Sequence, residues 1–501
     1  MTENAASPVI AVDDPATGRV IATVRNHTAA EVAEAVRLAR EVQPAWQELG
    51  FRGRAAVLRR CQRWFVDNSR RLRDSIAAEN GKTHDDAEVE VAYCTAAFGF
   101  WATHAERYLR PERVHSLSPF VVGRDLFVRY APVGVVGVIG PWNNPLMNSF
   151  GDAIPALAAG NAVILKPSEQ TPLTALLTED VLRQCGVPEG AYRVITGDGE
   201  TGSALVDTVD SVMFTGSTRT GRRVAERAAS RLIPVSLELG GKDPMIVLEG
   251  ADLERAANVA VYGALHNTGQ TCISVERLFV QDSIHDEFAA RVADRFRTLR
   301  QGRSRGFGQF DVGAMTFPPQ LDLVEAHVRD AVGQGARVLV GGEAHRDGGR
   351  FFEPTVLVDV DPSMRCMREE TFGPVLPIMR VHDAEEAVRL ANESSYGLQA
   401  SVFAGSAAEG LSIGRQLEAG VVTVNDALIN YMALELPMGG WKESGMGVRH
   451  GPEGIRKYTR RQSLLVARLV PRRELHMMPF RRRNYRVLTA LVRLLYGGSR
   501  S

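Results

Sequence analysis

The runs Val133-Gly-Val-Val-Gly-Val-Ile139 and Ala162-Val-Ile-Leu-Lys166 are short and apolar, and a helical pattern over Ser149–Ala159 separates them. The same order continues with a helix expected at Thr171–Gln184 and a strand at Tyr192–Ile195. Strands that alternate with helices at this spacing are typical of a parallel sheet with helices on both faces. This stretch therefore predicts an α/β fold.

The pattern extends in both directions along the chain. A capping-box signature at Thr28-Ala-Ala-Glu31 begins a helical region that ends near Leu109, and Phe120–Tyr130 is expected to form a projecting hairpin. A strand at Ser211–Phe214 leads to a helix at Thr220–Ser230. A second α/β region follows Gly240, with expected helices Leu253–Leu265, Asp286–Leu299 and Asp383–Ala391 and strands Arg277–Val280, Arg337–Val340, Val375–Arg380, Ala400–Phe403 and Val421–Asn425.

The composition narrows the class of protein. A chain of 501 residues is too long for one compact core, so two or more domains are expected. Basic and acidic residues balance at 59 each, which gives no reason to expect a nucleic-acid partner. The five cysteines are scattered, so neither a metal site nor a disulfide framework is indicated. The first residues do not resemble a signal peptide and no apolar run could span a membrane, so a cytoplasmic location is expected.

Three residues form a candidate catalytic set. Cys272 follows Asn267-Thr-Gly-Gln270 on a turn between an expected helix and strand, where a small molecule could reach a nucleophilic thiolate. A small buried hydrophobe is the commoner role of a lone cysteine. Glu238 lies between two leucines before a Gly-Gly turn, which should raise its pKa into the range of a general base. The Asn143 amide could hold a developing oxyanion.

Seven motifs that occur in order between about Ala11 and about Val466 resemble those of the aldehyde dehydrogenase superfamily. They are Pro141-Trp-Asn143, Lys166-Pro-Ser-Glu169, Phe214-Thr-Gly-Ser217, Leu237-Glu-Leu-Gly-Gly241, Gly269-Gln-Thr-Cys272, Glu370-Thr-Phe372 and Pro437-Met-Gly-Gly440. The resemblance implies a Rossmann-like NAD-binding domain, an α/β catalytic domain and a small β oligomerisation arm. The expected ranges are 1–116 with 132–239, 240–448, and 117–131 with 449–470. A homodimer or homotetramer is implied.

The resemblance also implies a dinucleotide site. Its expected residues are Pro141, Trp142, Lys166, Ser168, Glu169, Gly199, Gly202, Phe214, Thr215, Gly216, Ser217, Leu239, Gly240, Glu370 and Phe372. Glu169 could accept hydrogen bonds from both adenosine ribose hydroxyls and would repel a 2′-phosphate, which favours NAD over NADP; a solvated charged turn is the alternative. Gly197-Asp-Gly-Glu-Thr-Gly202 has dinucleotide-fingerprint spacing, although a single match is weak evidence. Amides at the start of the helix after Ser217 could bind a pyrophosphate.

Several channel positions depart from the family pattern. Asn144 stands where an aromatic residue is frequent, Asp152 where many members carry lysine, and Leu265-His266 where an aromatic pair is frequent. We expect a wider and more polar channel. Asp152 could raise the pKa of Glu238 further or simply pair with a lysine or arginine. His266 is interpreted as a hydrogen-bonded wall residue.

The expected reaction is NAD-dependent oxidation of an aldehyde to a carboxylic acid. Cys272 would form a thiohemiacetal and then a thioester, which Glu238 would hydrolyse by activating water. The presence of Glu238 favours hydrolysis over transfer to coenzyme A. Succinate semialdehyde is a candidate substrate, ranked behind a general aliphatic or aromatic aldehyde because no arginine pair for a distal carboxylate is evident. A structural or binding role without turnover is the remaining alternative.

The tail 471–501 lies beyond the family motifs. From Met477 onward it has no acidic residue and six arginines, and Arg481–Tyr496 is expected to form a basic amphipathic helix that Gly497-Gly498 ends. Docking of its apolar face on the enzyme or a neighbouring subunit is the commoner role of such a helix. Peripheral contact with an anionic membrane is the second interpretation.

Overall fold

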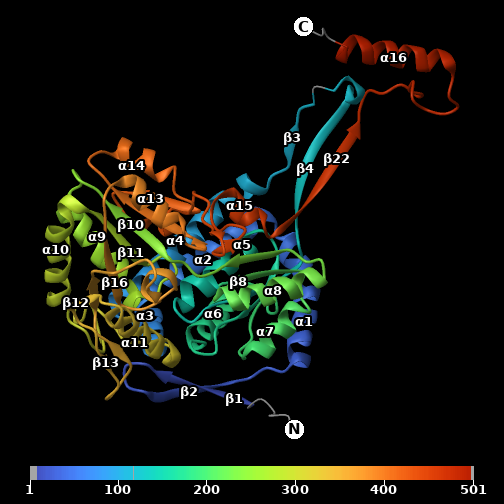
Figure 1. The fold of residues 1–501 in the computed structure, drawn as a ribbon. Coiled ribbons are helices and arrows are strands. Elements are labelled where there is room, and N and C mark those ends of the chain that lie inside the picture. The colour runs from blue at the N-terminus through green and yellow to red at the C-terminus, as the bar shows by residue number, and fades with distance from the viewer. Residues whose placement is uncertain (1–7, 117, 498–501) are drawn as a thin grey trace, which may run out of the picture. The chain divides into compact units, whose positions relative to one another are not determined.

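The computed structural model describes residues 8–116 and 118–497. The chain divides into two compact units (Figure 1). The first unit is Met1–Tyr108 with Pro132–Thr459, and the second is Leu109–Ala131 with Arg460–Ser501. Both expected α/β halves fall within the first unit, so the boundary near residue 240 remains a proposal.

The first half of this unit contains a six-stranded sheet in the order β21-β9-β8-β5-β6-β7, parallel except at the β21–β9 edge. Its strands are β5 (Val135–Ile139), β6 (Ala162–Lys166), β7 (Tyr192–Val194), β8 (Ser211–Thr215), β9 (Val235–Glu238) and β21 (Gly445–Met446). Ala162 and Ile164 join the core formed with α1, α7 and α8, so the intervening side chains of β6 point to the opposite face. The expected α/β fold is confirmed.

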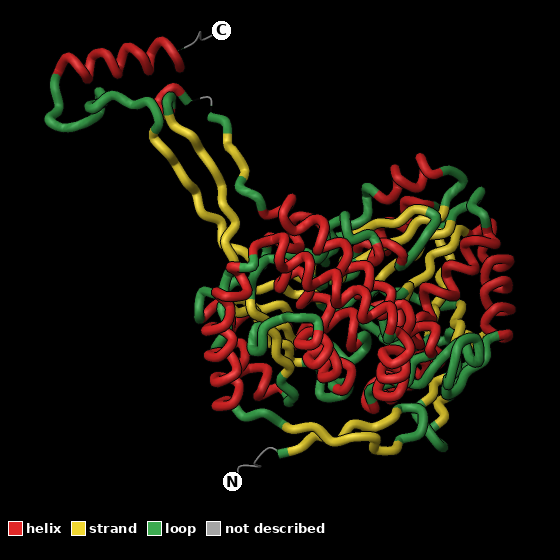
Figure 2. Tube along the Cα trace, turned by 180° about the vertical axis from the view of Figure 1, so that it is seen from behind, coloured by secondary structure: helices red, strands yellow, loops and turns green. Residues whose placement is uncertain are grey.

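Helices cover this sheet on both faces, as Figure 2 shows in red around the yellow strands. Their bounds are α1 (Ala29–Glu48), α5 (Gly151–Ala158), α6 (Leu173–Gln184), α7 (Gly199–Val206) and α8 (Thr218–Ser230). The capping box of α1 is confirmed, because the Thr28 side chain accepts from the Glu31 amide and the Glu31 carboxylate accepts from the Thr28 amide. The expected helix at 149–159 is partly wrong: it begins at Pro145 as the π-helix η2 (Pro145–Phe150) and continues as α5.

The second half contains a seven-stranded sheet in the order β12-β15-β16-β11-β10-β18-β19, parallel except for the β12–β15 pair. Its strands are β10 (Asp243–Val247), β11 (Val275–Gln281), β12 (Arg337–Val340), β15 (Thr355–Val358), β16 (Val375–Val381), β18 (Gln399–Phe403) and β19 (Val421–Val424). Its main helices are α9 (Leu253–Leu265), α10 (His285–Thr298), α11 (Pro318–Gly333), α13 (Ala384–Asn392) and α14 (Ala407–Gly414). Helices α11 and α14 were not expected from the sequence.

Smaller elements complete the first unit. They are the antiparallel pair β1 (Val9–Asp14) and β2 (Arg19–Arg25), the helices α2 (Gly50–Asp67), α3 (Ser69–Asn80), α4 (His84–Leu109), α12 (Arg365–Arg368) and α15 (Gly451–Arg456), and the two-residue strands β13 (Ala344–His345), β14 (Phe351–Phe352), β17 (Tyr396–Gly397) and β20 (Trp441–Lys442). Residues 449–459 were expected to belong to the arm. They fall in the first unit instead, because α15 packs on α5.

The second unit is a three-stranded sheet followed by a helix. Strands β3 (Glu112–Val114), β4 (Arg124–Pro132) and β22 (Thr459–Ala467) lie in the order β22-β4-β3, and α16 (Arg482–Tyr496) follows. The expected hairpin at 120–130 is wrong in its bounds: that stretch begins in the 3-10 helix η1 (Pro119–Val121) and continues as the single strand β4, which pairs with β3. The expected C-terminal helix is confirmed. Among the described residues, none of the helices is both long and apolar enough to span a membrane.

Candidate active site

A cleft of about 1630 Å³ in the first unit brings together nearly all the residues that the sequence singled out. The candidates that line it are Pro141, Trp142, Asn143, Lys166, Ser168, Glu169, Gly199, Gly202, Phe214, Thr215, Gly216, Ser217, Leu239, Gly240, Cys272, Glu370 and Phe372. Among the candidate catalytic and dinucleotide-binding residues, Glu238 alone does not line the cleft itself; it ends strand β9, beside Leu239. Residues from both halves of the unit therefore meet at one site.

Cys272 lies on the turn between α9 and β11, where the sequence placed it, and its side chain is half-buried. The approach is a 3-10 turn, η3 (His266–Gly269), in which Asn267 and Thr268 have positive φ angles of 54° and 60°. Such backbone conformations are costly for residues other than glycine and cluster at functional sites. Gly269 also has positive φ, and an added Cβ would lie 2.2 Å from the Gly373 carbonyl oxygen. The turn thus requires glycine there.

The Cys272 thiol is a weak acid in this setting. Burial raises its pKa to about 12, the Arg449 cation opposes the shift, and the carboxyl group of Glu238 adds to it. Because the thiolate is the nucleophilic form, the resting thiol needs a base to take its proton.

Glu238 has the properties of such a base. Its side chain is buried, with 1% exposure, and burial raises its pKa to about 7. Arg449 and Lys457 lower that pKa and Asp152 raises it. Its Oε1 atom has no hydrogen-bond partner among the described residues. The raised pKa expected from the sequence is confirmed, and burial is its largest cause.

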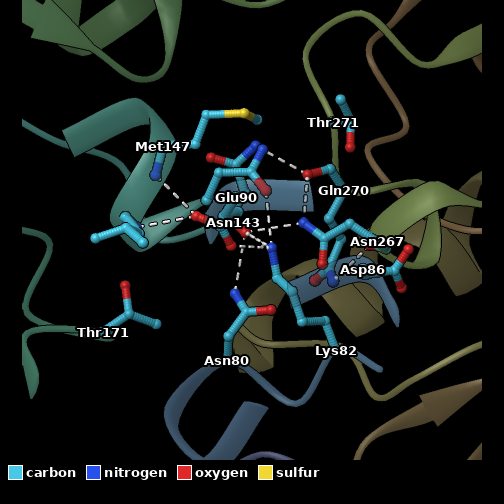
Figure 3. Close-up of polar contacts among 12 residues, drawn as sticks. Asn80, Lys82, Asp86, Glu90, Asn143, Met147, Thr171, Asn267, Gln270 and Thr271 are labelled. Atoms are coloured by element: carbon cyan, nitrogen blue, oxygen red, sulfur yellow. Dashed lines mark hydrogen bonds and ion pairs between the residues drawn. The ribbon is translucent and has the colours of Figure 1, made fainter. Parts of the chain in front are cut away.

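Asn143 is fixed by a buried ion pair that the sequence did not reveal (Figure 3). The Lys82 ammonium donates to the Asn143 carbonyl at 2.9 Å and to Asn144 Oδ1 at 2.7 Å, and it pairs with Glu90 at 2.6 Å. The other Glu90 oxygen accepts from the backbone amides of Leu146 and Met147, each at 2.9 Å. Lysine and glutamate side chains are usually exposed. The sequence therefore gave no indication that Lys82 and Glu90 are a buried pair and not two solvent-exposed charges.

Two further amides donate to the same Asn143 carbonyl. Asn80 Nδ2 lies 3.1 Å from it and Asn267 Nδ2 lies 2.8 Å from it. The Asn143 side-chain amide donates to the Gln270 carbonyl at 2.9 Å, which directs it toward the chain segment that ends at Cys272. Asn144 is 1% exposed and does not line the cleft, so the expectation that it makes the channel more polar is wrong. Lys82 holds it inside the protein.

Asp152 pairs with Arg449, a residue that sequence analysis missed. The guanidinium group donates to both Asp152 oxygens, at 3.1 and 2.7 Å. It also donates to Thr215 Oγ1 at 2.6 Å and to the Tyr431 hydroxyl at 2.9 Å. Both of the interpretations offered for Asp152 are confirmed, because it pairs with an arginine and also raises the pKa of Glu238.

His266 is buried at 7% exposure, and its Nδ1 lies 2.8 Å from Asp86 Oδ1. It does not line the cleft, so its expected place in the channel wall is not borne out, and its contact is with Asp86 inside the protein.

One end of the cleft has side chains that could bind the adenosine ribose and the pyrophosphate of a dinucleotide. Lys166 Nζ donates to the carbonyls of Pro167 and Gly197, and the partly exposed Glu169 carboxylate lies 3.9 Å from it. Ser217 caps α8, whose first turn has no acidic residue, and Arg219 and Arg223 line the cleft beside it. A helix N-terminus with neighbouring cations suits a pyrophosphate. The residues present therefore fit a nicotinamide dinucleotide.

Glu370 and Phe372 form the other end of the cleft. Glu370 Oε1 accepts from the Gly241 amide at 3.0 Å, and burial, followed by the neighbouring Glu276 charge, raises the Glu370 pKa to about 8. The Phe372 ring meets Trp142 edge to face, with centroids 5.3 Å apart. Glu276 accepts from the Phe372 amide at 2.8 Å, which holds that residue at a positive φ of 50°.

Comparison with known proteins identifies the family. The sequence model described as "Aldehyde dehydrogenase family" matches residues 2–464. A Mycobacterium tuberculosis protein named "Putative succinate-semialdehyde dehydrogenase [NADP(+)] 2" is 43% identical over 93% of this chain and 90% of its own length. A "4,4'-diapolycopene aldehyde oxidase" of a Methylomonas species is 38% identical over 97% of this chain and 91% of its own. The solved structure of an NAD-dependent aldehyde dehydrogenase from Sinorhizobium meliloti has a TM-score of 0.89 and 34% identity over 94% of both chains. The chain belongs to the aldehyde dehydrogenase family, whose members are NAD(P)-dependent oxidoreductases.

Proposed function

We propose that this enzyme oxidises an aldehyde to a carboxylic acid through covalent attachment to Cys272, with Glu238 as the base and NAD as the preferred cofactor. The observation that carries the proposal is a placement: Cys272 and Asn143 line one cleft, and Glu238 ends strand β9 directly before the cleft-lining Leu239. Burial raises the pKa of Glu238 to about 7, so a substantial fraction of it is ionised near neutral pH. The carboxylate can then accept the thiol proton as the sulfur attacks, and no free thiolate has to persist.

The first half of the reaction builds the thioester. Glu238 takes the Cys272 proton, directly or through a water molecule, and the sulfur attacks the aldehyde carbon. The Asn143 amide releases the Gln270 carbonyl and, with the Cys272 backbone N–H, donates to the oxyanion. Such a donor contributes about 3–4 kcal/mol. A bound NAD would supply the acceptor for the hydride that leaves the thiohemiacetal carbon, and Glu370 and Phe372 would hold its nicotinamide end.

The second half regenerates the thiol. Glu238 first releases the Cys272 proton to solvent. It then accepts a proton from water, the resulting hydroxide attacks the thioester carbon, and the carbon–sulfur bond breaks. The acid leaves, and the sulfur takes the proton that Glu238 holds, which returns both groups to their starting state. The buried, unpartnered Oε1 of Glu238 supports this second use of the same base.

The preference for NAD rests on Glu169. Its side chain is 41% exposed and lines the cleft, so its charge would face a ribose 2′-phosphate. The mycobacterial relative carries NADP in its name and the Sinorhizobium relative carries NAD. The two names point in opposite directions, which makes the local charge at residue 169 the deciding feature.

For the substrate we favour an apolar aldehyde over succinate semialdehyde. The buried Arg449 side chain makes hydrogen bonds to Asp152, Thr215 and Tyr431, so it offers little to a distal carboxylate. The Methylomonas relative is named for 4,4'-diapolycopene aldehyde, and the mycobacterial relatives are named for succinate semialdehyde. Succinate semialdehyde remains the second candidate because of that name.

We also propose that the enzyme assembles as a homodimer or homotetramer. Strand β22 is the nine-residue edge of the three-stranded sheet, and all but its first residue are exposed. A long exposed edge strand is a ready partner for another chain. The arm of the second unit would provide that contact.

Spectrophotometric detection of NADH formation with a panel of aldehydes tests the proposal. Apolar aliphatic and aromatic aldehydes should give the higher kcat/KM, and succinate semialdehyde a lower value. With Glu238→Gln, a burst of about one NADH per site should precede loss of steady turnover, unless loss of Cys272 deprotonation also slows the burst. Absence of both NADH formation from NAD and NADPH formation from NADP, with every aldehyde, would instead favour a non-catalytic role.

A further inference from the structure

The helix α16 carries an apolar face that the described residues of the second unit do not bury. None of its residues is buried, and Tyr485, Leu494 and Tyr496 are 73%, 81% and 61% exposed. The segment before it exposes Met478 and Phe480 at 76% and 74%. These residues lie beyond the part of the chain that the family model matches, which ends at residue 464. The aldehyde dehydrogenase fold therefore does not account for this surface.

The arrangement of side chains on α16 is strongly two-sided. At about 100° per residue, Arg482, Arg486 and Arg493 fall within a sector of about 40°. The aliphatic residues fall on the opposite side of the helix; they are Val487, Leu488, Leu491, Val492, Leu494 and Leu495. Tyr485 and Tyr496 lie at one boundary between the two faces, where aromatic residues with a polar tip are favoured at membrane–water interfaces.

The base of the tail is fastened to the arm. Arg124 on β4 forms an ion pair with Glu474, and both side chains are largely shielded from solvent. The Gly123 carbonyl accepts from the amides of Arg468 and Leu469 at 2.8 and 3.0 Å. An added Cβ at Gly123, whose φ is +78°, would overlap the Leu469 carbonyl oxygen. The helix is thus presented from an anchored segment.

We propose that α16 binds the surface of a bilayer that contains anionic phospholipid. The aliphatic face would enter the acyl boundary, the tyrosines would lie at headgroup level and the arginines would meet lipid phosphates. Charge decides between this occupant and a protein surface. The stretch from Met477 to Gly497 has no acidic residue and five arginines, and an all-cationic polar face is complementary to an anionic lipid surface. Docking on a second copy of the chain is the competing outcome.

Vesicle flotation with the purified full-length enzyme tests the proposal. Vesicles of equal parts phosphatidylserine and phosphatidylcholine should carry the enzyme upward at low salt, and pure phosphatidylcholine should carry much less. The triple substitution Arg482→Gln, Arg486→Gln, Arg493→Gln should lower partitioning onto anionic vesicles by about a hundredfold, at about fivefold for each arginine. The double substitution Leu491→Ser with Leu494→Ser should also weaken binding. The binding that remains should keep more of its salt dependence than the binding of the triple arginine variant does.

A matched control removes the same charge elsewhere. Arg52, Arg59 and Arg71 are exposed on α2 and α3, and their replacement by glutamine should leave flotation and activity on a water-soluble aldehyde unchanged. The proposal is overturned if the full-length enzyme does not float at low salt or if the control triple weakens binding as much as the α16 triple. It is also overturned if the α16 substitutions change the oligomeric mass in lipid-free buffer and leave flotation unchanged, which would assign α16 to a neighbouring subunit.

Discussion

The guanidinium group of Arg449 donates to both carboxylate oxygens of Asp152, and neither side chain is more than 5% exposed. Arg449 also donates to Thr215, which pairs with Glu238 across strands β8 and β9. Two opposite charges are therefore fixed beside the proposed base. One lowers the pKa of Glu238 and the other raises it.

Single substitutions of this pair should move the pH profile in opposite directions. Arg449→Gln removes the cation that lowers the Glu238 pKa, so the acid limb of kcat/KM should move to higher pH. Asp152→Asn removes an anion that raises it, so the limb should move to lower pH. Steady-state rates between pH 5 and 9 measure both shifts.

The double variant controls for folding. Breaking a buried pair by removing one partner costs about 3–5 kcal/mol of stability, and removing both charges costs less. The double variant should unfold at a higher temperature than either single variant and return the acid limb toward that of the parent. Shifts in the same direction for both single variants would contradict the electrostatic account.

Replacement of Cys272 by serine should abolish aldehyde oxidation and leave NAD binding within about twofold. A serine hydroxyl is a far weaker nucleophile than a thiolate, and the cleft residues that would hold the dinucleotide are unchanged. NADH formation and cofactor titration by fluorescence measure the two effects. Cys366→Ser, at a buried cysteine outside the cleft, serves as the control and should retain activity.

Much of the site could be predicted because its signals are local. Cys272, Glu238 and Asn143 each end or follow an element whose apolar pattern is clear, and parallel strands bring their carboxyl ends to one edge. The buried polar partners could not be predicted in this way. Lys82 lies 61 residues from Asn143 and Arg449 lies 297 residues from Asp152. Only the tertiary fold makes these charges neighbours, and their residue types are normally exposed.

The fold shows the same limit. Strand β6 has the bounds expected for it. A fully buried strand is a continuous apolar run in the sequence, and such a run is easy to recognise. The arm hairpin was misplaced because alternation in a sequence indicates a strand but does not identify its partners. The strand Arg124–Pro132 pairs with β3 and β22. The π-helix η2, which leads into α5, begins at Pro145, where proline fixes the first turn.

Lys82→Met should lower kcat by about ten- to hundredfold with little change in KM for NAD. The Asn143 carbonyl would lose its charged donor, and a small displacement of a positioned group can cost a factor of this size. The variant would also leave Glu90 without its cation. Adding Glu90→Gln should therefore recover thermal stability but not kcat. Recovery of both would show that Lys82 acts through stability alone.

Glu169→Ser should narrow the preference for NAD over NADP by at least about tenfold in kcat/KM, because it removes a charge that faces the ribose. The measurement is the ratio of kcat/KM values for the two cofactors at fixed aldehyde. Glu200→Ser, at another cleft-lining acid on α7, is the control. A parent enzyme that already prefers NADP would contradict the assignment to Glu169.

Glu238→Gln should stabilise the protein at alkaline pH. The folded-state pKa of about 7 exceeds the ordinary value of 4.5, so the stability associated with the protonated form is complete below about pH 4.5 and is lost as the pH rises through 7. Glutamine does not ionise and avoids that loss. Measured from its low-pH value, the difference in unfolding free energy between variant and parent should therefore grow from about 1 kcal/mol at pH 5 to about 3 kcal/mol at pH 8.5. Denaturant unfolding at the two pH values measures it, with the exposed Glu48→Gln as the control that should show no such growth. A constant difference in unfolding free energy across this pH range would mean that ionisation of Glu238 does not destabilise the folded protein. Burial would then not raise the pKa of Glu238 into the range of a general base.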